Sequence, residues 1–245
     1  MTRDPDTIPP PQSAKLREGA ALFARMANSF GHLGPRGPED GPRCLVIPGF
    51  LATDRTAMEL RRAFGGAGWH TYGWAAGLNK GARQDTIMRL RERLHSISQG
   101  EKVLLVGWSL GGLFAREFAA EAPGQVLAVV TLGSPFSGDP HWNNVWRLYE
   151  FVAGHPVDAP PLERSKDKPP VPTLALWSHR DGIVAPRAAY GLPEESDKAV
   201  DLGCTHMAFA VSRRWTRRVV AEAHRFLEEQ GLAVPQPEPL ARTLA

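Results

Sequence analysis

The hydrophobic positions of this chain alternate between short, wholly apolar runs and longer stretches in which apolar residues recur with a helical period. Runs such as Cys44–Ile47 and Leu127–Val130 contain no polar side chain, which is typical of strands buried on both faces of a parallel sheet. The pattern predicts strands at Arg43–Pro48, Trp69–Trp74, Lys102–Gly107, Val126–Leu132, Thr173–Ser178 and Lys198–Leu202.

Helical periods fill the stretches between these strands. They predict helices at Thr56–Phe64, Arg83–Ser98, Leu110–Ala122, Ala185–Tyr190 and Val211–Glu229. Strands that alternate with helices through right-handed crossovers form a doubly wound α/β domain, a mostly parallel sheet covered by helices. We therefore predict the α/β fold class, as a single domain over residues 13–233.

The two ends of the chain differ from this pattern. Residues 1–12 are rich in Pro and Asp, so we predict that they are disordered, and we predict a flexible tail at residues 234–245. Ser13 can cap a helix that runs to Phe30 with an apolar face. We expect this helix to coat the domain; the alternative, a helix on a membrane surface, is disfavoured because its polar face is not especially basic.

One connection is far too long for a plain strand-to-helix loop, and it spans residues 136–172. Its first half concentrates aromatic residues, and its second half is polar and rich in Pro. Aromatic side chains on an insertion above a sheet indicate a cap or lid over a pocket. The alternative is a helix that packs against the body of the domain.

The most informative motif is Gly107-Trp108-Ser109-Leu110-Gly111, with Gly112 after it. It follows a predicted strand and opens a predicted helix, which is the context in which Gly-x-Ser-x-Gly forms a nucleophile elbow. Small residues on both sides allow the tight turn, and the turn holds the serine hydroxyl clear of the sheet. Ser109 is therefore the predicted nucleophile; the alternative is a glycine-rich loop that only packs a helix on a strand.

A serine hydroxyl is a poor nucleophile at neutral pH, so it needs a general base, and the base needs an acid to orient it. The carboxyl ends of parallel strands build the site in such sheets. Asp181 follows the strand at Thr173–Ser178, and His206 follows the strand at Lys198–Leu202. We predict His206 as the base and Asp181 as the acid.

Other titratable residues near these strands are weaker candidates. His179 is beside Asp181 but lies at the edge of its strand, while Asp201 lies inside a strand. The remaining histidines and aspartates of the insertion and the last helix are interpreted as surface residues: His141, His155, His224, Asp158 and Asp167.

The reaction also needs N–H donors for the oxyanion of a tetrahedral intermediate. The amide of Leu110 begins a helix, where unpaired N–H groups favour negative charge. The second donor is expected from the loop after the first strand, where Gly49 allows a close approach and Phe50 supplies the amide. The alternative is a turn without a catalytic role.

The segment from Arg43 to Glu229 resembles serine hydrolases of the α/β-hydrolase superfamily, in particular the lipase and esterase branch. The resemblance is carried by Ile47-Pro48-Gly49-Phe50, the elbow with Gly112, Leu132-Gly133-Ser134-Pro135-Phe136-Ser137-Gly138, Ser178-His179-Arg180-Asp181-Gly182-Ile183-Val184, and His206 before the last helix. It implies a compact sheet of about six parallel strands in the order 4-3-5-6-7-8 of that superfamily, and no metal or other cofactor. Pro48 departs from the family by replacing its usual oxyanion-loop histidine, although the backbone donor should survive. The chain before Arg43 is too short for the two extra antiparallel strands of larger members.

Composition narrows the remaining possibilities. The formal net charge is only +3, and the basic run Arg213–Arg218 alternates with apolar positions at helical spacing, so we expect a solvated helix face and no nucleic-acid partner. The two cysteines, Cys44 and Cys204, fall on strands that we expect to be separated by three others, so free thiols are predicted. The sequence has no apolar leader or transmembrane run, and we expect a cytoplasmic protein of undetermined oligomeric state.

Together these features predict a carboxylic-ester hydrolase that acts on a small-molecule ester with an apolar group. The side chains expected to line its pocket are Leu51, Trp108, Phe136, Trp142 and Trp146. The same residues would also serve a thioesterase or an acyltransferase. A member of the superfamily that only binds a ligand is the remaining alternative.

Overall fold

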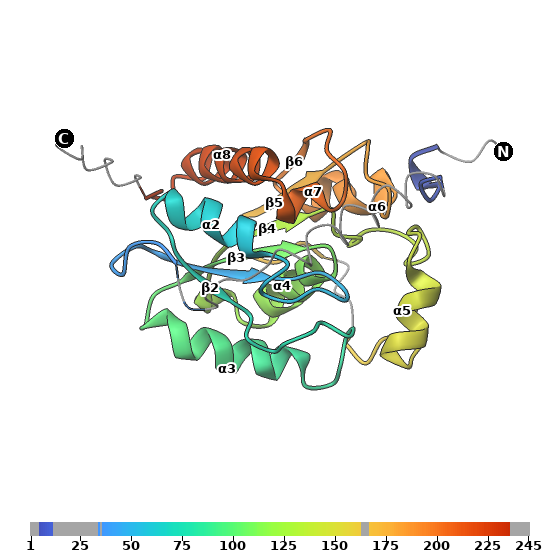
Figure 1. Ribbon diagram of the computed structural model, residues 1–245, viewed down its shortest axis with the longest axis horizontal. Helices are drawn as coiled ribbons and strands as arrows, with labels where there is room; N and C mark the ends of the chain where they lie inside the picture. The colour runs from blue at the N-terminus through green and yellow to red at the C-terminus, as the bar shows by residue number, and fades with distance from the viewer. Residues whose placement is uncertain (1–4, 12–33, 35, 163–166, 236–245) are drawn as a thin grey trace.

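The computed structural model describes residues 5–11, 34, 36–162 and 167–235, and its centre is a parallel sheet (Figure 1). The sheet has six strands in the order β2-β1-β3-β4-β5-β6, with every neighbouring pair parallel. The strands are β1 (Arg43–Ile47), β2 (His70–Gly73), β3 (Val103–Trp108), β4 (Val126–Leu132), β5 (Thr173–Trp177) and β6 (Lys198–Asp201). The predicted fold class and strand order are confirmed, and each predicted strand is present within one residue at either end.

Helices cover both faces of this sheet. They are α2 (Met58–Gly66), α3 (Thr86–Ser98), α4 (Leu110–Glu121), α5 (Trp146–Ala153), α6 (Pro186–Tyr190), α7 (Ala208–Val211) and α8 (Arg213–Glu229), with short 3₁₀ turns η1 (Pro5–Thr7), η2 (Pro123–Gln125) and η3 (Pro193–Glu195). Side chains alternate along β1, so Cys44 and Val46 pack with α2, α7 and α8 while Leu45 and Ile47 pack with α3 and α4. The apolar strands are therefore buried on both faces, as their sequences predict.

Two helical features differ from the sequence prediction. The last helix was predicted over Val211–Glu229, but α8 begins two residues later, at Arg213, because Ser212 has extended backbone (φ −97°, ψ 119°); the short helix α7 before Ser212 was not predicted. Helix α5 was not predicted as an element. Its sequence carries apolar side chains around most of its circumference: Tyr149 is buried, whereas Leu148 and Phe151 are exposed. At eight residues the helix is shorter than the stretch needed to identify a helical period in the sequence.

Part of the Pro- and Asp-rich segment near the start of the chain contacts the domain. Within residues 5–11, η1 packs near α6, the Tyr190 hydroxyl donates to Asp6, and Asn144 donates to the Pro10 carbonyl. These contacts explain why a Pro- and Asp-rich segment lies against the domain. The helix predicted at Ser13–Phe30 and residues 236–245 of the predicted tail lie outside the described residues.

The insertion is attached to the body of the domain by backbone pairing at its leading end. Asn143 forms an antiparallel bridge with Val184, the Asn144 amide donates to the Ile183 carbonyl at 2.8 Å, and the Ala185 amide donates to the Trp142 carbonyl at 2.9 Å. Residues 142–144 therefore run beside the loop that follows β5.

Both cysteines are buried, and neither forms a disulfide, as predicted. Cys44 lies on β1, and Cys204 lies in the loop after β6 rather than on a strand. No helix among the described residues has the length and hydrophobicity needed to cross a membrane.

Candidate active site

Ser109 lies in a sharp turn between β3 and α4, with φ 54° and ψ −122°. Only a few non-glycine residues have positive φ, and here the surrounding contacts hold the strained conformation. The Ser109 amide donates to the Leu132 carbonyl at 2.8 Å, which fixes the turn against the end of β4.

The elbow glycines are required by close backbone packing. A Cβ at Gly107 would lie 2.4 Å from the Gly111 carbonyl oxygen, and a Cβ at Gly111 would lie 2.3 Å from the Ile47 carbonyl oxygen. A Cβ at Gly112 would lie 2.0 Å from the Ser134 hydroxyl. The glycines therefore allow the elbow to touch the loops after β1 and β4, which places Ser109 at the carboxyl edge of the sheet.

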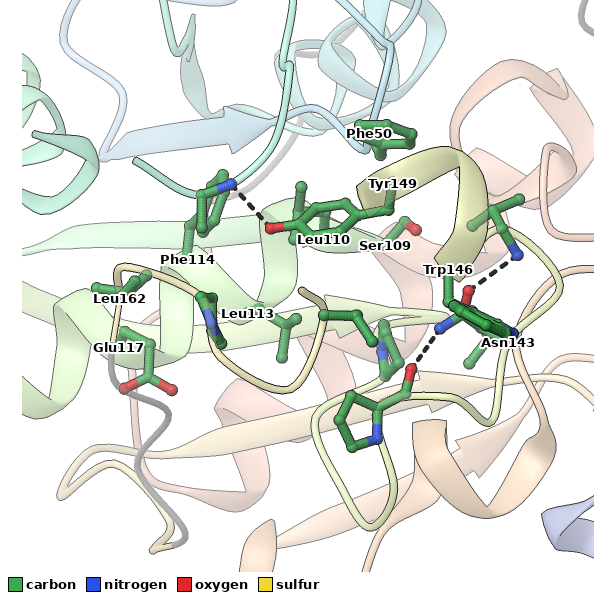
Figure 2. A pocket seen from close by; sticks show the side chains of 17 residues that line it. Phe50, Ser109, Leu110, Leu113, Phe114, Glu117, Asn143, Trp146, Tyr149 and Leu162 are labelled. Atoms are coloured by element: carbon green, nitrogen blue, oxygen red, sulfur yellow. Dashed lines mark hydrogen bonds between the residues drawn. The ribbon is translucent and has the colours of Figure 1, made fainter. Parts of the chain in front are cut away.

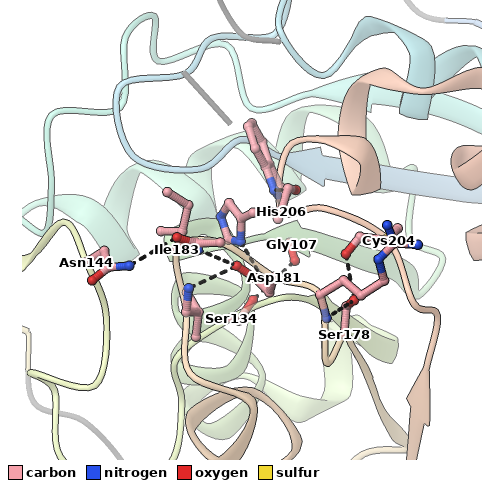
Figure 3. A network of polar contacts seen from close by, with 12 residues as sticks. Gly107, Ser134, Asn144, Ser178, Asp181, Ile183, Cys204 and His206 are labelled. Atoms are coloured by element: carbon pink, nitrogen blue, oxygen red, sulfur yellow. Dashed lines mark hydrogen bonds and ion pairs between the residues drawn. The ribbon is translucent and has the colours of Figure 1, made fainter. Parts of the chain in front are cut away.

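Asp181 and His206 form a hydrogen bond at the same edge of the sheet (Figure 3). His206 Nδ1 is 2.7 Å from Asp181 Oδ2, and both side chains are buried. The other carboxylate oxygen, Oδ1, accepts the amides of Ile183 and Val184 at 2.8 and 2.9 Å. Because a carboxylate accepts, Nδ1 carries the proton, and Nε2 is left as the nitrogen that can take up another proton.

Gly133 makes room for this pair. It has φ +55°, and a Cβ there would lie 2.9 Å from Asp181 Oδ2 and 3.1 Å from His206 Nδ1. The loops that carry the two side chains are also tied together, because the Ser178 hydroxyl donates to the Cys204 carbonyl at 2.6 Å. The acid and the base are therefore held by both packing and hydrogen bonds.

The His206 loop is attached directly to the elbow. Trp108, the residue before Ser109, donates its indole N–H to the His206 carbonyl at 3.2 Å. The Trp108 and His206 rings lie 5.8 Å apart between centroids. The structure thus brings the three residues of the predicted triad to one end of β3, β5 and β6, with the Asp181–His206 contact formed.

The loop after β1 lies against Ser109. A Cβ at Gly49 would be 3.0 Å from Ser109 Cβ, a tight contact, so glycine favours this close approach. The amides of Phe50 and Leu110, the two predicted oxyanion donors, have no backbone acceptor among the described residues. Both residues line the cavity that contains Ser109.

This cavity has about 740 Å³ of empty space, including its opening to solvent (Figure 2). Four residues of α4 form one wall at helical spacing: Leu110, Leu113, Phe114 and Glu117. The opposite wall comes from the insertion and includes Trp146, Tyr149, Val157 and Leu162. The wall is almost wholly apolar, and Ser109 contributes a hydroxyl beside the end of the α4 row.

The predicted pocket residues require correction. Trp146 lines the cavity, but the other four residues lie outside its wall. Trp108 packs on His206, Phe136 lies 4.2 Å below the Arg116 guanidinium, and Trp142 fills the space over Gly138. Leu51 has a positive φ of 55° and follows Phe50, which does line the cavity. These aromatic side chains support the loops around the cavity rather than face it.

Several wall residues were missed by the sequence analysis. Leu113 and Phe114 were assigned only to a helix, although their spacing from Leu110 could have identified the face of α4 that follows Ser109. Nothing in the sequence distinguishes Val157 or Leu162 from other positions of a Pro-rich connection.

The alternative histidines lie elsewhere. His179 pairs with Asp201 and His141 pairs with Asp139, in both cases near the surface. His224 is half-buried against Trp69, on the far helix α8. Among the described residues, no group of three or more His, Cys, Asp or Glu side chains could hold a metal ion.

Comparison with known proteins gives a consistent picture of the fold. A family profile described as the alpha/beta hydrolase fold matches residues 81–152. No curated protein matches the sequence at a significant level.

Solved structures extend the likeness to most of the chain. Carboxylesterase CesB (YbfK) from Bacillus subtilis superposes with a TM-score of 0.54 at 14% identity, over 86% of this chain and 98% of that one. Monoacylglycerol lipase from Paleococcus ferrophilus gives 0.57 at 15% identity, over 80% and 97%. A thioesterase domain from the curacin biosynthetic pathway gives 0.54 at 14% identity, over 79% and 93%. At these identities the likeness establishes the fold.

Proposed function

We propose that this chain, whose fold is that of the α/β-hydrolases, is a serine hydrolase that cleaves carboxylic esters. The observation that carries the proposal is the buried Asp181–His206 hydrogen bond beside a strained Ser109. A nucleophile, a base and an orienting acid at one edge of the sheet form the arrangement that acyl transfer to a serine requires.

In the proposed reaction, Ser109 Oγ attacks the acyl carbon while His206 Nε2 takes up the hydroxyl proton. The electron pair of the carbonyl double bond moves to oxygen, and the amides of Leu110 and Phe50 bind the resulting oxyanion. His206 then donates its proton to the leaving alcohol as the ester bond breaks. A water molecule, activated by His206, releases the acid and restores Ser109.

Asp181 and the two amides have separate tasks in this scheme. Asp181 holds the imidazole in the tautomer with its proton on Nδ1 and stabilises the cation that forms. Each amide of the oxyanion pair would lower the barrier by about 3–4 kcal/mol, because it is aimed in advance at a charge that develops only in the transition state. Strained backbone at Ser109 and Leu51 is consistent with such preorganisation.

The cavity supports an apolar acyl group as the bound part of the substrate. Its wall follows α4 from Leu110 to Glu117, a rise of seven residues or about 10 Å. An extended hydrocarbon with bonds near 1.5 Å advances about 1.3 Å per bond, so this wall matches roughly eight carbons. The insertion at residues 136–172 would form the cap over the bound acyl chain, and helix α5 would be the part of the cap that contacts it.

The proposal is tested by active-site labelling and by turnover of an ester series. A fluorophosphonate probe should label the wild type, whereas Ser109→Ala should neither label nor turn over substrate. Among p-nitrophenyl esters from acetate to palmitate, turnover should be highest at medium length. Failure of the wild type both to label and to cleave any ester would overturn the proposal in favour of a ligand-binding protein.

The bound orientation of the acyl chain has its own test. Leu113→Trp should shorten the longest ester accepted, because Leu113 lies in the wall of the cavity. Leu148→Trp is the matched control, since Leu148 is an exposed leucine on the outer side of α5. Equal length profiles for the two variants would exclude the wall along α4 as the acyl site.

A thioester is the second candidate substrate. The same nucleophile and oxyanion donors would serve it, and a solved thioesterase domain has this fold. Assays with acyl-CoA, with and without an added alcohol, distinguish an esterase from a thioesterase or an acyltransferase by their products.

A further inference from the structure

Asn79 lies in the loop between β2 and α3 and is fully buried, although loops of this kind are normally at the surface. Its side-chain Nδ2 and both of its backbone polar groups bond to the loop after β1. We propose that Asn79 is a positioning residue that holds the oxyanion loop, and with it the Phe50 amide, in its working conformation. This inference rests on the proposed function.

Asn79 makes hydrogen bonds on both sides of Phe50. Its side-chain Nδ2 donates to the Pro48 carbonyl at 2.9 Å, and its carbonyl accepts the Leu51 amide at 2.8 Å. Its own amide donates to the Ala52 carbonyl at 2.9 Å. Three contacts from one residue therefore fix the chain before and after the donor while leaving the Phe50 amide itself available.

The loop needs such an anchor because its backbone is strained. Leu51 has φ 55°, a conformation that costs a branched side chain about 1 kcal/mol or more. Gly49, on the other side of Phe50, lies against Ser109. A small rotation of the loop would turn the Phe50 amide away from the position of the oxyanion, and a misplacement of about 1 Å can cost roughly 100-fold in rate.

The chemistry of the site selects asparagine. Nδ2 must donate to the Pro48 carbonyl, while Oδ1 accepts the Gly81 amide at 3.2 Å. A carboxamide supplies the donor and the acceptor on two separate atoms at neutral pH, as these two partners require. Leucine offers neither group, and an aspartate carboxylate offers no donor.

The same loop reaches the wall of the cavity. The Ala82 amide donates to the Tyr149 hydroxyl at 3.0 Å, and the Tyr149 ring lies 5.2 Å from the Phe50 ring between centroids. Asn79 therefore belongs to a continuous set of contacts that joins the oxyanion loop to helix α5.

Two substitutions test the role. Asn79→Asp keeps the acceptor for Gly81 but sets an oxygen against the Pro48 carbonyl, so at neutral pH we expect kcat to fall about 10- to 100-fold with little change in KM. Burial raises the pKa of an introduced carboxyl. Its protonated form regains a donor, so the activity of Asn79→Asp relative to the wild type should rise as the pH falls. Asn79→Ala has no donor at any pH and should show a constant ratio.

Thr173→Val is the matched control. Thr173 is also fully buried, and its hydroxyl donates to the Val171 carbonyl at 2.9 Å, but it begins β5 at the edge of the sheet away from Ser109. This variant should lose stability and keep kcat. Binding of a trifluoromethyl ketone, which forms a tetrahedral adduct with the serine, should weaken in the Asn79 variants in parallel with kcat/KM.

The outcomes separate this inference from the proposed function. If the wild type is active but the Asn79 variants keep its kcat and ketone affinity, or if the pH ratio of Asn79→Asp is flat, the positioning role is wrong. If the wild type itself cleaves no ester and binds no ketone, the proposed function fails first.

Discussion

Two Asp–His pairs connect the loops after β5 and β6, and they differ in surroundings rather than in bond length. Asp181 from the β5 loop contacts His206 from the β6 loop at 2.7 Å. In the opposite direction, His179 from the β5 loop contacts Asp201 at the end of β6 at 2.6 Å. The side chains of the first pair are 2% and 5% exposed, whereas those of His179 and Asp201 are 61% and 33% exposed.

The comparison teaches that a short Asp–His distance does not by itself make a catalytic pair. An exposed ion pair is screened by water and contributes about 0–1 kcal/mol. In the buried pair, two backbone amides hold one carboxylate oxygen, and Gly133 leaves the space that both side chains need. Only that pair combines a fixed tautomer with a position beside the elbow.

Exchange of each aspartate for asparagine gives the largest expected contrast. Asp181→Asn should lower kcat about 10⁴-fold, because the amide favours the wrong imidazole tautomer. Asp201→Asn should stay within about twofold of the wild type, since its partner is solvated. Both are measured as kcat on the best p-nitrophenyl ester. Comparable losses of kcat in the two variants would show that burial does not distinguish the catalytic pair from the surface pair.

Substitution of the glycine beside each Asp–His pair by alanine should give a second difference in kcat, of intermediate size. Gly133 and Gly203 both have positive φ, so alanine adds similar backbone strain at either position. At Gly133 the new Cβ also meets Asp181 and His206, whereas at Gly203 the nearest atom is His179 Cε1 at 3.4 Å, an ordinary contact. Gly133→Ala should reduce kcat about 10- to 100-fold beyond any loss of stability.

Gly203→Ala should lower the melting temperature and leave kcat near the wild-type value. An equal loss of kcat in the two variants, measured well below both melting temperatures, would mean that backbone strain and not the contact with the pair is responsible.

Substitution of a third histidine, His224, should have the smallest effect, and the effect is on stability. His224 Nε2 accepts the indole N–H of Trp69 at 2.8 Å, and burial lowers the pKa of His224 below its usual range. As the pH falls, the imidazole of His224 is therefore protonated first in the unfolded chain, at a pH of about 6.5. The contribution to stability is complete above that pH and is lost as the pH falls towards the lowered pKa of the folded state.

His224→Gln keeps an acceptor for Trp69 and removes the proton. Urea unfolding should show a smaller loss of stability between neutral and mildly acidic pH in this variant than in the wild type. His95→Gln, at an exposed position of α3, is the control and should follow the wild type. Parallel curves for all three proteins would rule out His224 as a source of the acid sensitivity.

The sequence predicted the fold and the candidate triad because both depend on short-range patterns. Apolar runs mark the buried strands before Ser109 and Asp181, and His206 follows the more polar strand β6 at the same edge, where parallel strands end. Residue type and position along the chain were sufficient for these predictions.

The cavity wall and Asn79 depend on contacts between distant segments, which a single sequence does not contain. The insertion aromatics Phe136 and Trp142 pack against the body, while aliphatic residues on α4 and in the Pro-rich connection form much of the wall. Asn79 lies among residues typical of a turn, and only the folded chain shows its contacts with the loop after β1. Helix α5 was missed because its eight residues are too short a stretch to identify a helical period.

The backbone pairing between residues 142–144 and the loop after β5 has a consequence for chimeric proteins. Ile183 and Val184 contribute both to this pairing and to the amides that hold Asp181. Replacement of the insertion, including residues 142–144, by that of another protein would therefore disturb the position of Asp181 as well as the substrate selectivity. The safer junction lies after Val145, so that exchange of α5 and the Pro-rich stretch alters which molecules enter and leaves the chemistry in place.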